Sequence, residues 1–283
     1  MIQYKKCSEV EIDLVYEAFQ VGYVDYMIKF DISKEDFIKR FFGLEGNRLE
    51  HSFIAMSNHE PIGIILGGVK NYEGIQTMRC GTLAIHPEFR GMEISHKLFE
   101  LHKEEALLNG CQQLFLEVIA GNERAIQFYK KLGYEKVYDL SYYNLKDVSQ
   151  LIMKSDEDIE IKQIQFNEFQ QEMKKWLNFH MNWQNDIDYM EKSVNNTYYS
   201  AYFNTELLGC LCVNASGKIS FLFVDKEFRE KGIASLLIQT ACEKLQLLDL
   251  SIGFPNNSLL EGFLKKLHFE KGSLTQYEMY LVL

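Results

Sequence analysis

The sequence lacks long hydrophobic runs, clustered metal ligands and an excess of positive charge. The apolar run IGIILGGV, which begins at Ile62, is far shorter than the roughly 20 residues that a membrane span needs. The N-terminus carries no apolar signal core. These absences predict a cytoplasmic chain with no membrane partner.

The six cysteines show none of the spacings typical of a metal site. Cys210 and Cys212 are two positions apart on a predicted strand, so their side chains share one face. Scattered cysteines in a cytoplasmic chain are usually reduced and serve packing. We therefore expect six reduced cysteines and no metal.

The net charge of −10 divides evenly, because each side of Leu145 carries −5. No basic stripe is present, so nucleic acid is not expected as a partner. Aminoacyl transfer from a charged tRNA is disfavoured for the same reason. The acidic balance mildly favours cationic partners such as amines.

Two pairs of similar segments indicate a duplicated domain. EFREKGIASLL from Glu227 resembles EFRGMEISHKL from Glu88, with Arg229 lying 139 positions after Arg90. KKLGYEK from Lys130 recurs as KKLHFEK 135 positions later. Two matches at nearly one offset argue for two tandem copies. We expect an N-terminal domain over 1–146, a linker over 147–158 and a C-terminal domain over 159–283.

Each half predicts the element order β, α, α, β, β, β, α, β, α, β, β, from hydrophobic periodicity and turn signals. Ser8 with Glu11 predicts a capping box at one helix start, and Ser33 predicts the next start. A long helix is expected from Arg90 to Leu108. The fold class is α/β (α+β), with a mixed sheet flanked by helices.

The repeated loop joins a strand directly to a helix. In REKGIA, Arg229 offers charge, Gly232 lets the backbone approach a ligand, and Ala234 keeps the next turn small. Free N–H groups and the helix dipole make such a point suitable for phosphate. A capped helix with an incidental glycine would look the same, but the recurrence of the loop before an asparagine-headed helix favours a ligand role.

The loop resembles R/Q-x-x-G-x-G/A, the signature of the GNAT superfamily of acetyl-CoA-dependent N-acyltransferases, and both halves match that element order. The resemblance implies a mostly antiparallel sheet whose fourth and fifth strands splay apart around acetyl-CoA. The implied cofactor-binding residues of the first half are Ala84, Ile85, Arg90, Gly91, Met92, Glu93, Ile94, Ser95 and Asn122. Those of the second half are Val224, Arg229, Glu230, Lys231, Gly232, Ile233, Ala234 and Asn257.

The first loop departs from the signature at two positions. Glu93 stands where the family has glycine, and Ser95 stands where it has glycine or alanine. Ser95 is small enough to fit. Glu93 places a negative charge beside the expected pyrophosphate unless its carboxylate reaches solvent, or it simply decorates a first helical turn.

LEV at Glu117, the helix-heading Asn122 and FY at Tyr129 resemble the bacterial N-terminal alanine acetyltransferases of ribosomal proteins. The resemblance implies that Glu117 acts as base and Tyr129 as acid, with the backbone at Ala84 and Ile85 polarising the thioester carbonyl. Taken singly, Glu117 could be a solvent-facing strand residue and Tyr129 a core aromatic. The second half aligns Ile252 with Glu117 and Leu264 with Tyr129, and so lacks both groups.

We therefore predict an N-acetyltransferase that moves an acetyl group from acetyl-CoA to a primary amine by direct attack, with the chemistry in the N-terminal domain. The acceptor would be a small-molecule amine or a protein N-terminus, and the chain a pseudo-dimeric monomer or a homodimer. One alternative places the activity in the C-terminal domain, through Tyr277 or a substrate-assisted route. Another is a non-catalytic protein that binds coenzyme A or acts as a scaffold.

Some residues admit a plainer interpretation. His96 and His102 lie on the long helix without a metal-spaced carboxylate, so we expect both at the surface. An aromatic and methionine group in the second half predicts hydrophobic packing or, alternatively, an aromatic wall for a substrate. Its members are Trp176, Phe179, Met181, Trp183 and Tyr189.

Overall fold

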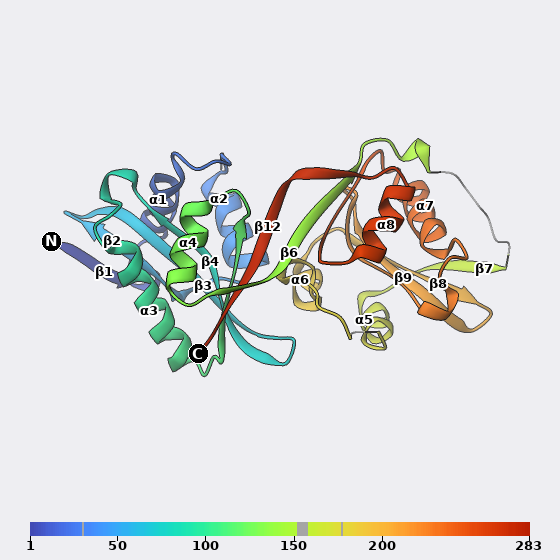
Figure 1. Ribbon diagram of the computed structural model, residues 1–283, viewed down its shortest axis with the longest axis horizontal. Coiled ribbons are helices and arrows are strands. Elements are labelled where there is room, and N and C mark those ends of the chain that lie inside the picture. The colour runs from blue at the N-terminus through green and yellow to red at the C-terminus, as the bar shows by residue number, and fades with distance from the viewer. Residues whose placement is uncertain (30, 152–157, 177) are drawn as a thin grey trace. The chain divides into compact units, whose positions relative to one another are not determined.

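The computed structural model describes residues 1–29, 31–151, 158–176 and 178–283. The chain forms two compact units, each described here by itself. The first unit contains Met1–Val137 and Tyr277–Leu283, and the second contains Tyr138–Gln276. Figure 1 shows a sheet with flanking helices in each unit.

In the sheet of the first unit, the strands follow the order β1 (Ile2–Lys6), β2 (Arg48–Ser57), β3 (Glu60–Tyr72), β4 (Ile75–Ile85), β5 (Gln113–Ile119) and the end of β12 (Glu270–Val282). Neighbouring strands from β1 to β4 pair antiparallel, and the next pair is parallel. Consecutive strands of the β2–β3–β4 meander pair antiparallel. β4 and β5 are parallel because the helix α3 (Ile94–Leu108) carries the chain back between them.

Helices cover both faces of this sheet. α1 (Ile12–Tyr23) and α2 (Lys34–Phe37), which continues into a π-helix over Ile38–Leu44, pack on one face with Ile54 and Ile64. α3 and α4 (Glu123–Lys131) pack on the other face with Phe53 and Ile65. Because neighbouring strand residues point to opposite faces, the sheet feeds two separate cores.

The predicted helix starts are confirmed in one case and wrong in another. The Ser33 hydroxyl accepts from the Asp36 N–H at 3.1 Å, as expected of an N-cap. The box expected at Ser8 and Glu11 does not form. β1 continues to Lys6, whose N–H binds Glu9 at 3.3 Å across a short 3-10 turn, and α1 begins only after Glu11.

The second unit repeats this arrangement. Its strands follow the order β6 (Glu135–Leu145), β11 (Leu250–Pro255), β10 (Lys218–Val224), β9 (Glu206–Asn214), β8 (Asn196–Phe203) and β7 (Ile159–Ile164). Its helices are α5 (Phe166–Lys174), α6 (Ile187–Lys192), α7 (Ile233–Leu245) and α8 (Ser258–Lys266). β10 and β11 form its parallel pair.

The parallel strands separate in both units. Pairing of β4 with β5 ends at Arg79 and Phe115, although β4 continues to Ile85. Pairing of β10 with β11 ends at Ile219 and Ile252. We call the space beyond these points the first fork and the second fork. The α/β (α+β) class and the splayed strands expected from the sequence are confirmed.

Two strands are shared between the units. β6 begins in the first unit and contributes Tyr138–Leu145 to the second, while β12 ends with Tyr277–Leu283 in the first. The boundaries of the compact units therefore differ from the sequence repeat, which we expected over 1–146 and 159–283. Those bounds stay a prediction, and part of the expected linker, 152–157, lies outside the described residues.

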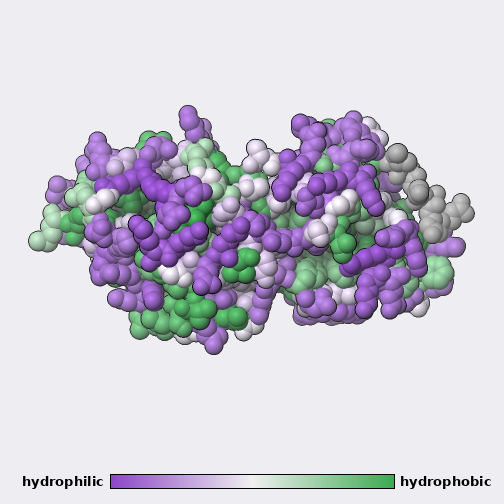
Figure 2. Space-filling view, viewed as in Figure 1, coloured by the Kyte–Doolittle hydropathy of each residue, from purple (hydrophilic) through white to green (hydrophobic). Residues whose placement is uncertain are grey.

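All six cysteines are free and buried, as expected. None of the helices in the described ranges is long and apolar enough to cross a membrane. The face seen in Figure 2 is largely hydrophilic, with a hydrophobic area near the end of α3, where Leu107 and Leu108 are exposed. The expectation for His102 is wrong, because this side chain is 0% exposed on the inner face of α3.

Candidate active site

The two phosphate loops, Arg90–Ser95 and Arg229–Ala234, share one backbone shape. In each, the first and third residues after the arginine adopt a left-handed conformation: Gly91 (φ 80°) and Glu93 (φ 60°) in the first loop, Glu230 (φ 65°) and Gly232 (φ 84°) in the second. Each loop thus carries one glycine and one glutamate at equivalent positions, in exchanged order. Replacing glycine by Glu93 therefore preserves the shape of the cradle.

Glu93 does not close the cradle. It is the N-cap of α3, and its side chain is 83% exposed, with a carboxylate oxygen 3.9 Å from His96 Nε2. A Cβ added at Gly232 would meet nothing within 4 Å, so open space lies over the N-terminus of α7. Both helix starts thus offer backbone N–H groups that fit a pyrophosphate.

The buried Ile94 and Ile233 anchor these helices in their cores. Ser95 and Ala234 follow them and are half-buried, whereas Met92 and Lys231 are exposed.

The two loop arginines have different partners. Nε of Arg90 donates to the Ile85 carbonyl at 3.0 Å, and Nε of Arg229 donates to the Val224 carbonyl at 3.1 Å. The rest of the Arg90 guanidinium binds both oxygens of Asp25 at 2.5 and 2.7 Å, and these bonds lower the pKa of Asp25. Among the described residues, no carboxylate lies within 4.0 Å of the Arg229 guanidinium.

The predicted asparagines are helix caps. Asn122 Oδ1 accepts from the Ala125 N–H at 3.2 Å, and Asn257 Oδ1 accepts from the Leu260 N–H at 3.0 Å. These bonds fix the start of the helix that follows each fork.

Ala84 and Ile85 point to opposite faces of β4. Ala84 packs closely under α1: a Cβ added to Gly22 would lie 2.6 Å from the Cβ of Ala84. Ile85 joins the core under α3. The Val224 side chain is likewise buried, in the core of the second unit.

Glu117 lies at the base of the first fork in an ion pair. Its Oε2 accepts from Arg79 at 2.7 Å, and Arg79 also donates to Glu45 at 3.2 Å. The Glu117 side chain is only 2% exposed. Burial tends to lower the pKa of Arg79, but the two carboxylates outweigh it and raise this pKa above its ordinary value. The other oxygen of Glu117, Oε1, is buried with no hydrogen-bond partner in the described part of the chain.

Tyr129 reaches the same strand from the opposite face. It is 8% exposed, and its hydroxyl lies near the thiol of Cys80, the residue after Arg79. Burial, followed by the nearby Cys80, raises the pKa of Tyr129 well above its ordinary value. Because Arg79 and Cys80 point to opposite faces, Glu117 and Tyr129 approach the start of the fork from its two sides.

The second fork lacks both groups, and its register corrects one predicted equivalence. In the first unit, Arg79 pairs with Phe115, which lies two positions before Glu117. Lys218 lies 139 positions after Arg79, the same offset that separates the two loop arginines, and it pairs with Ser251. Gly253, rather than Ile252, therefore occupies the place of Glu117. Ile252 points into the core, as does Leu264, which is 0% exposed.

Tyr277 does not support chemistry in the second unit, because it belongs to the first. Its ring lies 3.9 Å from Lys136 Nζ there.

Sequence reasoning missed the polar partners at the first fork. Arg79 is the one charged residue in β4, and that signal could have identified it. Asn47 gave no such signal. It is 0% exposed, its Nδ2 donates to the Phe41 carbonyl at 2.8 Å, and its Oδ1 has no described partner. Oδ1 occupies the space that a side chain at Gly81 would need.

The aromatic group of the second unit is divided. Met181 and Trp183 are buried, which fits packing. Trp176 instead stacks on Phe223 with ring centroids 4.9 Å apart, and its Nε1 donates to Asp225 at 3.0 Å. Phe179 also stacks on Phe223, with ring centroids 5.6 Å apart, and is 40% exposed. These rings lie beside Arg229, whose guanidinium is 5.5 Å from the Phe223 ring.

Each unit thus combines a forked mixed sheet with a loop of two left-handed residues that opens a helix, which defines a tandem protein of the acyltransferase class. Residues 13–134 match the family model described as "Acetyltransferase (GNAT) family", and residues 159–272 match the one described as "Acetyltransferase (GNAT) domain". The chain belongs to the GNAT acetyltransferase family, with two such domains in tandem.

An acetyltransferase of Pectobacterium atrosepticum is 32% identical over 84 residues, which are 30% of this chain and 57% of that protein. The chain thus spans little more than half the length of this relative.

Solved structures resemble the whole chain in fold. A tandem GNAT protein from the clavulanic acid biosynthesis pathway aligns with 100% of this chain and 98% of its own, at TM-score 0.71 and 13% identity. A GCN5-related N-acetyltransferase from Sphaerobacter thermophilus aligns with 100% of this chain and 95% of its own, at TM-score 0.67 and 13% identity.

Proposed function

We propose that the protein transfers an acetyl group from acetyl-CoA to a primary amine by direct attack, with the chemistry in the first unit. Acetyl-CoA supplies a reactive acyl thioester. The observation that supports this proposal is the buried Glu117 side chain. One of its oxygens is held by Arg79, and the other has no hydrogen-bond partner among the described residues. A buried, oriented acceptor oxygen of this kind suits a general base.

Glu117 would take a proton from the attacking amine through Oε1, directly or through one water molecule. Arg79 prevents the carboxylate from rotating, since it holds Oε2 at 2.7 Å. Glu45 in turn holds Arg79. The base is therefore oriented before the acceptor arrives.

Tyr129 would return a proton to the departing thiolate. Its raised pKa keeps the phenol protonated at neutral pH, which an acid requires. Tyr129 packs in the same core as Cys80, which keeps its ring against β4. Backbone N–H groups around Ala84 and Ile85 would polarise the thioester carbonyl.

The acceptor would be a small-molecule amine or a protein N-terminus. The net charge of −10 favours a cationic molecule over an anionic one. A cytoplasmic location, and a pseudo-dimeric monomer or homodimer, stay predictions.

The test is thiolate release from acetyl-CoA with a panel of amines, in Glu117→Gln and Tyr129→Phe. We expect kcat to fall by about 10² to 10⁴ in each variant, with smaller changes in KM. Tyr134→Phe is the matched control, because this neighbouring phenol is also buried but has no role in the proposal. Parent-like turnover in both folded variants would remove Glu117 and Tyr129 from the mechanism.

A second candidate is suggested by the loop arginines. Arg90 is held by Asp25, whereas Arg229 is exposed and has no described carboxylate partner. The second unit could therefore hold acetyl-CoA without catalysing transfer. Calorimetric titration of acetyl-CoA into Arg90→Gln and Arg229→Gln distinguishes the two. Loss of binding in Arg229→Gln alone favours this candidate, and loss in Arg90→Gln favours the first unit.

A further inference from the structure

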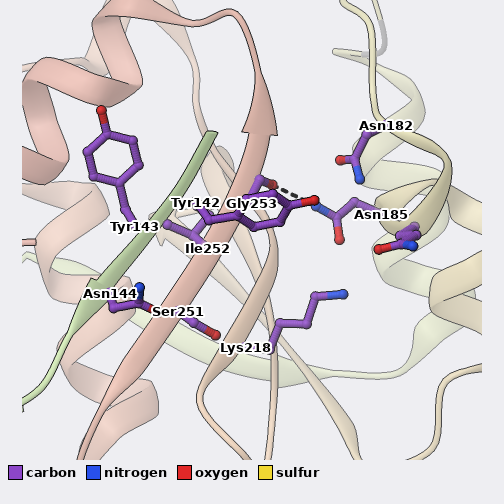
Figure 3. Close-up of a pocket in the computed structure, with 10 residues that line it drawn as sticks. Tyr142, Tyr143, Asn144, Asn182, Asn185, Lys218, Ser251, Ile252 and Gly253 are labelled. Carbon is purple, nitrogen blue, oxygen red and sulfur yellow. Dashed lines mark hydrogen bonds between the residues drawn. The ribbon is translucent and has the colours of Figure 1, made fainter. Parts of the chain in front are cut away.

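A small cavity lies at the base of the second fork, within the second unit. Its volume is about 190 Å³. Drug-sized ligands occupy roughly 300–1,000 Å³, so this cavity suits a smaller metabolite. Figure 3 shows side chains from β6, β10, β11 and the segment before α6 around it. Its polar lining includes Asn144, Asn182, Gln184, Asn185, Lys218 and Ser251.

The cavity exists where the first unit places Glu117. Gly253 holds the equivalent position and lines the cavity. A Cβ there would lie 2.6 Å from the ring of Tyr142, so glycine also lets this ring lie against β11. The Tyr142 hydroxyl donates to Gln276 at 2.5 Å, which fixes the ring as one wall.

Asn185 presents an unused acceptor at this cavity. The residue is 5% exposed, and its Nδ2 donates to the Gly253 carbonyl at 2.8 Å, so the side chain is fixed. Its Oδ1 is buried and has no hydrogen-bond partner in the described part of the chain. An unsatisfied buried acceptor is costly, and an N–H or O–H donor from a ligand would satisfy it.

The remaining polar groups are mostly uncharged. Four carboxamides line the cavity, and each can both donate and accept. Lys218 is the one charged side chain among the lining residues, and its Nζ lies 5.3 Å from the Tyr189 ring. No carboxylate is among them, so an ammonium ligand would find no counter-charge in the lining.

We propose that the second unit binds a small uncharged molecule with hydroxyl or amide groups, of about monosaccharide size, and that one of these groups donates to Asn185 Oδ1. The carboxamides serve its remaining groups, and the Tyr142 ring supplies an apolar wall. Gly253 leaves no acid at this position, so the cavity serves binding rather than proton transfer. This inference does not depend on chemistry in the first unit.

The experiment is calorimetric titration of the full chain with glucose, N-acetylglucosamine, a set of small amides, small carboxylates and amines. We expect a neutral polyol or amide to bind at one site per chain. Asn185→Leu should weaken that binding by about tenfold or more, because one buried hydrogen bond is lost. Asn144→Ala should weaken it too, and its exposed position leaves the fold intact. Asn178→Ala, exposed in the same unit and outside the cavity, is the control.

Three results would overturn the proposal: no neutral probe binds, only amines or carboxylates bind, or Asn144→Ala and a folded Asn185→Leu bind the neutral probe like the parent. Circular dichroism establishes whether Asn185→Leu is folded. If it is not, Asn144→Ala and Gln184→Ala decide the matter, since both remove carboxamides from the lining.

Discussion

Glu93 and Glu230 hold a left-handed backbone that favours glycine. This conformation costs a residue with a side chain about 1–2 kcal/mol. We expect Glu93→Gly to raise the free energy of unfolding by about 1 kcal/mol, less the added entropy of the unfolded chain. Chemical denaturation measures it. Glu100→Gly, within α3, is the control and should destabilise, because its backbone is helical. Equal losses in both variants would contradict the argument.

The buried His102 is a second residue that lowers the free energy of unfolding. Both ring nitrogens are buried without described hydrogen-bond partners. Replacement by an apolar side chain removes this penalty, so His102→Leu should stabilise the protein by about 1–3 kcal/mol. Thermal unfolding measures it, with the half-exposed His96→Leu as control. A destabilised His102→Leu would show that the imidazole has a partner or that leucine does not fit.

The same histidine predicts a pH dependence. Burial lowers the pKa of His102 to about 3, with Glu105 opposing and His51 adding to the shift. Above the ordinary value of 6.5, both the folded and unfolded states hold a neutral ring. Between pH 6.5 and about 3 the unfolded state binds the proton and the folded state does not. The free energy of unfolding therefore decreases as the pH is lowered through this range. The advantage of His102→Leu should therefore grow over this range, as unfolding at several pH values would show.

At the scale of the element, Arg79 joins β4 to β5 and to the segment after the π-helix. Removing it leaves Glu45 and Glu117 buried beside each other without their shared cation. We expect Arg79→Met to lower the free energy of unfolding by about 3–5 kcal/mol. Arg40→Met is the control, since Arg40 pairs with Glu45 at 2.9 Å but its side chain is 48% exposed, so its loss should cost about 1 kcal/mol or less. Similar losses in both variants would disprove a special role for Arg79.

The sequence selects Glu117 and Tyr129 as candidate site residues because they match a family motif, whereas it does not predict their environment. Arg79 is 38 positions from Glu117, and only the parallel register of β4 and β5 brings them together. Likewise, alignment of the two halves by a constant offset made Ile252 the equivalent of Glu117. Strand pairing moves the match to Gly253, and this one-residue difference changes which face a side chain occupies.

At the scale of the whole molecule, each compact unit needs a strand from the other half of the sequence. Met279 of β12 is 0% exposed in the core of the first unit, and β6 pairs with β11 in the second. We expect the fragments 1–146 and 159–283, made separately, to be unstable and prone to aggregate through the exposed edges of β5 and β11. Coexpression should restore a soluble complex.

Size-exclusion chromatography and thermal unfolding of the separate and coexpressed fragments test this expectation. The single substitution Met279→Ala in the full chain tests the same contact more mildly. It should destabilise by about 2–5 kcal/mol, since it leaves a cavity in the core. A fragment 1–146 that unfolds like the intact chain would show that the first unit does not need β12.

The sequence alone determined the duplication, the strand-and-helix order, the loops that precede α3 and α7, and the motif around Glu117, because these depend on residues close together in the chain. The tertiary structure decided the left-handed positions in those loops, the partners of Arg90 and Arg79, the burial of His102 and the sharing of β6 and β12. The reason is physical. Local periodicity and capping follow from neighbouring residues, whereas strand register, ion pairing and burial depend on contacts between residues far apart in the sequence.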